Sequence, residues 1–117
     1  KKLINIIHPK VRQKLDQFLK KNNKEKIVIL DVPLLLENKL NIPEDIIIYI
    51  EPKKKLLKNK LKKRFLYNKK IISILNKIQL PLEEKKAAAD YIIVNDFNKK
   101  KMMLRIKKLL GNIVLND

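Results

Sequence analysis

An α/β fold with a parallel sheet is predicted by the way apolar runs alternate with helical segments along these 117 residues. Three apolar runs are rich in β-branched residues, as parallel strands buried on both faces usually are; they lie at 27–32, 45–52 and 90–96. The segments between them repeat apolar residues at helical spacing. Strands that alternate with helices are typical of a parallel sheet covered by helices.

The first helix is expected over residues 8–24, HPKVRQKLDQFLKKNNK. Pro9 suits the first helical position, where the amide hydrogen that proline lacks would have no partner. Apolar residues then fall on one face at helical spacing, namely Val11, Leu15, Phe18 and Leu19. The pair Asn22-Asn23 is expected to end this helix.

Three helices are expected between the second and third strands. Residues 53–63 form a helix of lysine and leucine, and residues 68–79 place apolar residues on one face of a second helix, at Ile71, Leu75 and Ile78. Pro81 starts a third, short helix whose first turn holds Glu83 and Glu84. Carboxylates are favourable there because the amino-terminal end of a helix is electropositive.

The last helix begins after Asn98, a good amino-terminal cap, and Gly111 is expected to close it,. Its inner stripe is predicted at Met103, Ile106 and Leu110. Three strands make a thin sheet, and buried parallel strands need neighbours on both sides. The sequence therefore leads us to expect that amino-terminal strands are missing.

The net charge of +17 has two interpretations. One is a polyanionic partner such as a nucleic acid, a nucleotide or a phosphorylated cofactor. The other is a base-composition bias, because the codons of Lys, Ile and Asn are all rich in A and T. The lysines are spread over the whole chain, with three arginines and 5% aromatic residues, whereas nucleic-acid-binding proteins more often combine clustered arginine with stacking aromatics. The second interpretation is favoured, so nucleic acid is not the expected partner.

Several absences narrow the chemistry further. The chain has no cysteine and a single histidine, His8, so thiolate chemistry and a histidine metal cluster are excluded. Without an apolar run as long as a membrane span or a signal-peptide pattern, a cytoplasmic protein is expected, with no membrane partner. One glycine, Gly111, excludes a glycine-rich phosphate loop,. That absence, and a first residue that is Lys1, suggest that something amino-terminal is missing.

Five motifs then appear in a recognisable order: HPKVR (8–12), VILDVPLLLEN (28–38), KLKKR (60–64), IQLPLEEK (78–85) and ADYIIVND (89–96). In this order and at about this spacing they resemble dephospho-coenzyme A kinases. The resemblance covers essentially the whole chain, which would be the carboxyl-terminal part of such an enzyme.

The resemblance implies a P-loop kinase of the nucleoside-monophosphate-kinase type. Such an enzyme transfers the γ-phosphoryl group of ATP to the 3′-hydroxyl of dephospho-CoA, and Mg²⁺ is expected in it. In one kinase domain, residues 1–25 would end the substrate-binding helical region and 26–52 would be core strands. Residues 53–80 would form the lid and its flanking helices, and 81–117 the last core strand and the final helix.

The phosphate loop of the family is absent, although phosphoryl transfer depends on positioning and electrostatics around the γ-phosphate. The chain alone is therefore expected to be inactive, as a fragment of a longer enzyme. A natural short pseudo-kinase and a small basic nucleic-acid-binding module are the alternatives. No obligate protein partner is inferred.

The resemblance makes Arg64 the catalytic candidate, a lid arginine that binds the ATP phosphates; otherwise it is an ordinary residue on a solvated helix. An arginine kept in a chain so rich in lysine favours the first interpretation. Asn95 follows a strand at the edge where ligands gather in open α/β sheets. It is expected either to contact the adenine side of ATP or to be a turn residue that ends the strand.

The remaining candidates belong to the dephospho-CoA side of the proposed site. Arg12 would meet a phosphate of the substrate and His8 would lie beside it, unless His8 only packs or caps the helix. Asp31 ends a strand as acids that organise Mg²⁺ do, or it caps a turn, and no metal ligand can be assigned. The pocket would be lined by Pro33, Leu34 and Leu35, although an apolar loop is more often part of the core.

Overall fold

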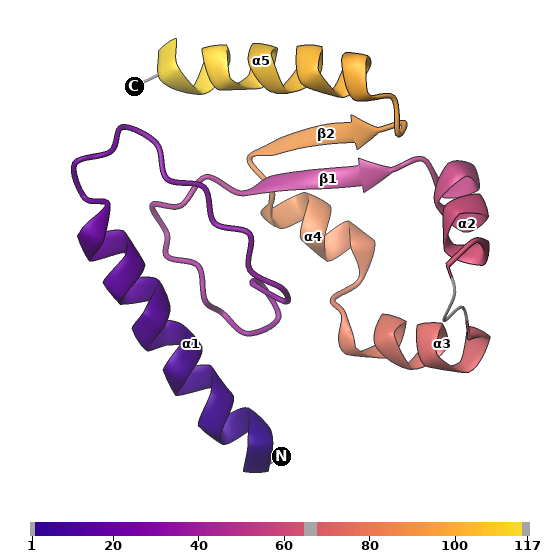
Figure 1. Ribbon diagram of the computed structural model, residues 1–117, viewed down its shortest axis with the longest axis horizontal. Helices are drawn as coiled ribbons and strands as arrows, with labels where there is room; N and C mark the ends of the chain where they lie inside the picture. Colours follow the sequence, from indigo (N-terminus) through magenta and orange to yellow (C-terminus); the bar gives the residue numbers. More distant parts are fainter. Residues whose placement is uncertain (1, 65–67, 116–117) are drawn as a thin grey trace. The chain divides into compact units, whose positions relative to one another are not determined.

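The computed structural model describes residues 2–64 and 68–115 and forms two compact units, residues 1–41 and 42–117 (Figure 1). Residues 65–67, within the expected lid, lie outside the described residues, as do 1, 116 and 117. None of the described helices is both long enough and apolar enough to cross a membrane.

The first unit begins with helix α1, Lys2–Lys21, which contains Pro9 in its interior. The prediction that Pro9 starts the helix is therefore wrong. A proline in a helix interior removes one backbone hydrogen bond and its ring crowds the preceding turn, but here the helix continues on both sides of Pro9. The carboxyl-terminal end is as predicted, because the backbone N–H and the Nδ2 of Asn22 both donate to the carbonyl of Phe18, at 3.1 and 2.8 Å.

The strand expected at 27–32 is not formed, and the backbone there is irregular. Within this segment Ile27 and Ile29 are 44% and 76% exposed. Strand propensity does not suffice, because an extended segment becomes a strand only when a neighbour pairs with its backbone groups. No described segment pairs with it.

The second unit is built on two parallel strands, β1 (Ile48–Pro52) and β2 (Tyr91–Asn95), paired in register from Ile48 opposite Tyr91 to Pro52 opposite Asn95. Both expected strands are confirmed, each slightly shorter than predicted. Asp90 fixes the start of the register, because its Oδ2 accepts from the N–H of Ile47 at 2.7 Å and its own N–H donates to the Ile47 carbonyl at 2.8 Å.

Three helices connect the strands: α2 (Lys54–Lys62), α3 (Lys69–Ile78) and α4 (Leu82–Ala88). Their bounds agree with the predicted helices to within a residue or so. Asn68 caps α3 by accepting from the N–H groups of Lys70 and Ile71, and the two glutamates lie in the first turn of α4 as predicted. An ion pair of 2.5 Å between Lys86 Nζ and Glu51 Oε1 joins α4 to β1, and the hydrogen bond to Glu51 raises the pKa of Lys86.

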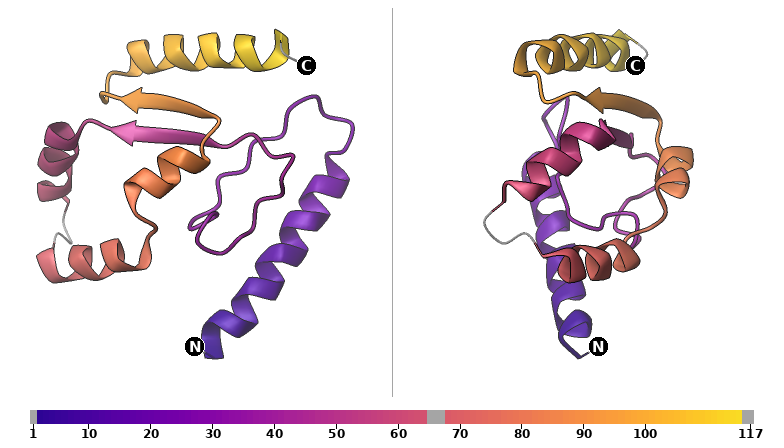
Figure 2. Two further views of the ribbon diagram at one scale, coloured as in Figure 1. Left: turned by 180° about the vertical axis from the view of Figure 1, so that it is seen from behind. Right: turned by 90° about the vertical axis from the view of Figure 1, so that its right-hand side faces the viewer.

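The core of this unit lies between β2 and the last helix, α5 (Lys99–Leu115), which runs alongside β2 in both views of Figure 2. It consists of Ile93, Leu109 and Ile113, with Tyr91 and Met102 packed against it. The strands are less covered than predicted, since Ile50 and Ile92 are 55% and 50% exposed. The described residues thus form an α/β fold with a small two-stranded parallel sheet flanked by helices, consistent with a kinase-like fold.

Two predictions for α5 are wrong, although its cap at Asn98 is confirmed by a 3.0 Å hydrogen bond from the N–H of Lys101. The inner stripe contains Leu109 and Ile113, whereas Met103 and Ile106 are 48% and 38% exposed. Gly111 does not close the helix, which continues to Leu115. A glycine in a helix interior costs only about 1 kcal/mol, and burial of Ile113 one half-turn later offsets that cost.

Candidate functional site

The carboxyl ends of β1 and β2 lie at the same edge of the sheet, because the strands are parallel and Pro52 pairs with Asn95. The N–H of Lys53 donates to the carbonyl of Asn95 at 3.1 Å, which holds the two strand ends together. Beyond this edge β1 continues into α2, and β2 continues through a short turn into α5. Ligands of open α/β sheets bind at such an edge.

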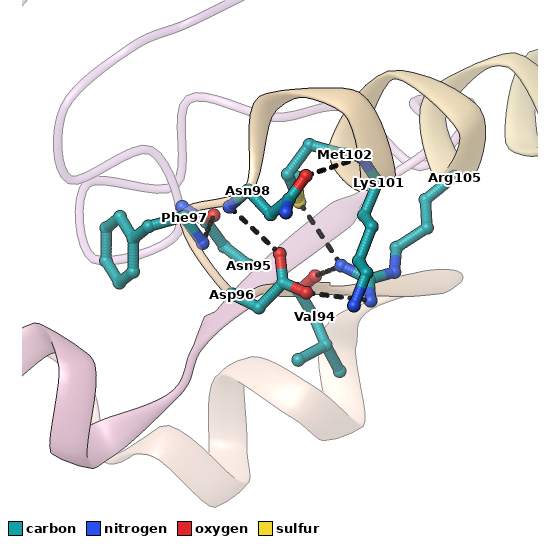
Figure 3. Close-up of polar contacts among 8 residues, drawn as sticks. All are labelled: Val94, Asn95, Asp96, Phe97, Asn98, Lys101, Met102 and Arg105. Atoms are coloured by element: carbon teal, nitrogen blue, oxygen red, sulfur yellow. Dashed lines mark hydrogen bonds and ion pairs between the residues drawn. The ribbon is translucent and has the colours of Figure 1, made fainter.

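The turn after β2 is held by its own polar side chains (Figure 3). Asn95 Oδ1 accepts from the N–H of Phe97 at 2.8 Å, and Asp96 Oδ1 accepts from the N–H of Asn98 at 3.1 Å. Side chains of this type commonly satisfy backbone donors two residues later. They leave Phe97 in the left-handed region, with φ of 59°, which is rare for a bulky residue.

Arg105, on α5, clamps the same turn from one side. Its Nη1 donates to the carbonyl of Val94 at 2.9 Å, and its Nη2 donates to Asp96 Oδ2 at 3.2 Å. The Asp96 side chain is only 10% exposed. Its pKa is lowered, first by the hydrogen bond from Arg105 and then by the N–H of Asn98, with a further contribution from the charge of Lys101. The carboxylate is therefore ionised at neutral pH.

An open pocket of about 280 Å³ lies where the end of α2 meets this turn. It is lined by Leu57, Lys60, Leu61, Lys63, Arg64 and Phe97. The Nζ of Lys60 lies 5.1 Å from the centre of the Phe97 ring, within range of a cation–π contact,. The lining therefore combines apolar and aromatic surface with three positive charges, a combination that suits a flat ligand bearing anionic groups.

Both candidates of the second unit lie at this edge of the sheet, but in different ways. Arg64 lines the pocket, and its exposed side chain is available to an anion. The Asn95 side chain accepts the Phe97 N–H and so acts as a turn residue in this structure. A catalytic role for Arg64 and adenine contact by Asn95 remain predictions.

The candidates of the first unit gather around a turn over residues 33–39. Arg12 Nη2 donates to the carbonyls of Asn38 and Lys39, both at 3.3 Å, so the guanidinium holds the end of this turn. Half-buried His8 lies one helical turn before Arg12, hence on the same face of α1,.

Pro33, Leu34 and Leu35 open the same turn, in which Leu34 adopts φ of 54°. The carbonyls of Leu34 and Leu35 accept from Asn38 and Leu40, at 3.1 and 3.0 Å. Asp31 lies exposed in the irregular segment before it. The first unit therefore brings Arg12 and the apolar turn together, and their substrate roles remain predictions.

The described part of the chain has no cluster of side chains that could bind the expected Mg²⁺. Among residues 2–64 and 68–115 there is no group of three or more His, Cys, Asp or Glu side chains that could hold a metal ion. These residues therefore do not fit a metal ion held by protein side chains.

Apart from Arg64 and Asn95, the residues of this site were not predicted from the sequence, among them Lys60, Phe97 and Arg105. Arg105 carried a usable signal, because it is one of three arginines in a chain dominated by lysine. Phe97 carried none, since phenylalanine seldom adopts a positive φ and nothing local indicates one.

Comparison with known proteins connects these features to a family. The family model described as "Dephospho-CoA kinase" matches residues 1–101. A dephospho-CoA kinase of Wolbachia pipientis wMel is 29% identical over 99% of this chain and 60% of its own length. One of Bartonella quintana is 32% identical over 97% of the chain and 60% of its own length.

A dephospho-CoA kinase of Prochlorococcus marinus subsp. pastoris is 33% identical over 91% of this chain and 52% of its own length. The chain thus spans at most about 60% of the length of these curated relatives. Because the family model covers most of the chain and the relatives align along nearly all of it, the chain belongs to the dephospho-CoA kinase family.

Proposed function

We propose that the protein carrying these residues transfers the γ-phosphoryl group of ATP to the 3′-hydroxyl of dephospho-CoA, in the cytoplasm. Family membership supports this reaction. The observation that links this reaction to particular residues is the cationic pocket at the carboxyl edge of β1 and β2. Arg64, after α2, and Phe97, after β2, both line this pocket. We further propose the P-loop kinase architecture, with the helices of residues 53–80 as its lid.

Arg64 is the residue to which we assign phosphate binding and catalysis. A guanidinium can donate two parallel hydrogen bonds to phosphate oxygens, and it stays charged at any physiological pH. Phosphoryl transfer gains mainly from positioning and from neutralising charge on the transferred group. Lys60 and Lys63, in the same pocket, add positive potential that attracts the ATP phosphates.

These 117 residues contain one glycine, so the contribution proposed for them is the arginine arm and the wall of the nucleotide site, not the phosphate cradle. Asn95 lies on the adenine side through the turn that it holds. Magnesium is expected with ATP, bound mainly through the nucleotide phosphates, as kinases generally bind it.

The first unit is assigned to dephospho-CoA. Arg12 and His8 would face the substrate from α1, and Pro33, Leu34 and Leu35 would contact its apolar part. Asp31 lies at the entrance to the same turn. The contact of Arg12 with the carbonyls of Asn38 and Lys39 supports this assignment, because it ties the helix to the loop that would line the pocket.

The test is a phosphorylation assay on the full-length gene product, with ATP and dephospho-CoA as substrates and coenzyme A identified by mass spectrometry. Replacing Arg64 with Ala should lower kcat by about a thousandfold or more, the range found for arginines that meet a transferring phosphoryl group. Lys62→Ala is the matched control, because Lys62 is exposed at the end of α2, two residues before Arg64, and does not line the pocket.

Two results would count against the proposal at different levels. Failure of the unmodified protein to form coenzyme A would refute the function itself. Full activity in Arg64→Ala would leave the function standing and remove Arg64 from the chemistry.

A further inference from the structure

Phe97 is held in a conformation that its residue type disfavours. A left-handed φ lowers the population of a non-glycine residue by a factor of roughly 5 to 30, and Phe97 lies at φ of 59°. Glycine or asparagine would adopt this backbone more readily. A strained residue that persists must be fixed by its surroundings, and such residues are common at binding sites.

The surroundings that fix Phe97 lie on the other side of the turn from its ring. In Figure 3 the ring points away from Arg105, Asp96 and Asn98. Arg105 donates to the carbonyl of Val94 and to the carboxylate of Asp96, so its contacts lie on both sides of Asn95. Because the Asp96 carboxylate is 10% exposed, its pairing with Arg105 is better shielded from water than a surface ion pair.

The ring itself lies in the pocket described above. One contact is with Lys60, and the other lining groups include Leu57, Leu61 and Arg64. An aromatic ring with leucines offers a flat apolar surface, while the nearby cations attract phosphates. A nucleotide has both parts, a planar base and a chain of anionic groups.

We propose that Phe97 contacts the base of ATP, and that Arg105 and Asp96 are positioning residues that hold it there. This inference rests on the proposed function for the identity of the nucleotide. Arg105 takes no part in the chemistry and affects ATP binding only by holding the backbone of the turn. Loss of the clamp lets Phe97 relax to negative φ, and the fraction of protein competent to bind ATP falls accordingly.

The test is direct binding of ATP to the full-length gene product by isothermal titration calorimetry, followed by steady-state kinetics. Phe97→Leu keeps a bulky apolar side chain but removes the aromatic face, and it should weaken ATP binding about tenfold, as loss of base stacking does. Arg105→Gln should weaken it by a similar factor, roughly 5 to 30, through the relaxed turn. Arg105→Lys keeps a charged donor and should restore part of the loss.

The double variant Phe97→Leu/Arg105→Gln separates a positioning role from a merely structural one. If Arg105 acts through Phe97, adding Arg105→Gln to Phe97→Leu weakens ATP binding no further, whereas independent effects would multiply. The KM for dephospho-CoA should not change. Lys108→Gln, an exposed cation one turn further along α5, is the charge-matched control and should bind ATP normally.

Three results would overturn the inference. They are a double variant whose loss of ATP affinity is the product of the two single losses, equal losses for ATP and dephospho-CoA, and unchanged ATP binding in Phe97→Leu. If the unmodified protein binds ATP with this pattern but forms no coenzyme A, the proposed function fails while the role of Phe97 stands. If it binds no ATP, both fail.

Discussion

Gly111 gives a sharp test of where the last helix ends. The sequence predicts that this glycine closes the helix, whereas in the structure α5 continues to Leu115. The two alternatives make opposite predictions for Gly111→Ala. In a closing residue with left-handed backbone, a Cβ atom introduces strain and the variant is destabilised. In a helix interior, alanine is the better residue.

The magnitude follows from the local geometry. Gly111 does not have a positive φ, and a Cβ built on it would meet nothing within 4 Å. The substitution therefore adds no clash and no strain. The gain is the difference in helix propensity, about 0.8 to 1 kcal/mol in free energy of unfolding, part of which comes from the lower entropy of the unfolded chain.

Urea unfolding of the full-length protein, followed by circular dichroism, measures this gain. With a typical slope of about 1 to 3 kcal/mol per molar urea, the midpoint should rise by about 0.3 to 1 M. Lys107→Ala, an exposed substitution in the same helix, is the control and should shift the midpoint much less, because lysine and alanine have similar helix propensities. A lower midpoint for Gly111→Ala would contradict the helix described through residue 111.

Two further predictions concern the same part of the fold. Ile113→Ala should lower the free energy of unfolding by about 2 to 3 kcal/mol, at the low end for such a truncation because the side chains around this small core can partly collapse. Val114→Ala, at a position 55% exposed, is the control. Equal urea midpoints for the two variants would show that Ile113 is not in the core. The pKa of Asp96 lies below its usual 3.8, with Arg105, Lys101 and the Asn98 N–H facing the carboxylate, so its contribution to stability is present above pH 3.8 and is lost as the pH falls through the lowered value. Unfolding midpoints of Asp96→Asn should therefore depend less on acid than those of the unmodified protein, and parallel pH profiles would remove the pair from the stability of this unit.

Local signals predicted the helices between the strands well. Pro81 and the two glutamates after it predict a helix start, and α4 begins there. The apolar spacing of residues 68–79 predicts a helix, and α3 lies within that range, with Asn68 as its cap. The segment 27–32 has an equally strong local pattern. Whether this segment forms a strand depends on a partner strand, which a local pattern cannot supply. Among the described residues the predicted strand is not formed.

The inner face of α5 shows a second limit of sequence reasoning. Apolar residues lie on several sides of this helix, among them Met102, Met103, Leu104, Ile106 and Leu109. Periodicity then allows more than one stripe, and contact with β2 selects the one that contains Leu109. At the site, the resemblance suggested Arg64 and its rarity against a lysine background favoured a functional role; the same rarity would have drawn attention to Arg105. The position of the Phe97 ring depends on a backbone conformation that its residue type disfavours, and so only the structure reveals it.

The hydrogen bond from Lys53 to the carbonyl of Asn95 has a mechanical consequence. It anchors the start of α2 to the turn that carries Phe97, while Arg64 lies just past the other end of that helix. With nine residues, α2 is about 13 Å long, so it would act as a lever if it tilted about Lys53. A tilt of about 10° would move its far end by about 2 Å, enough to make or break a hydrogen bond. Under the proposed function, such a tilt would bring Arg64 onto a phosphate group or withdraw it, while the turn that carries Phe97 stays in place.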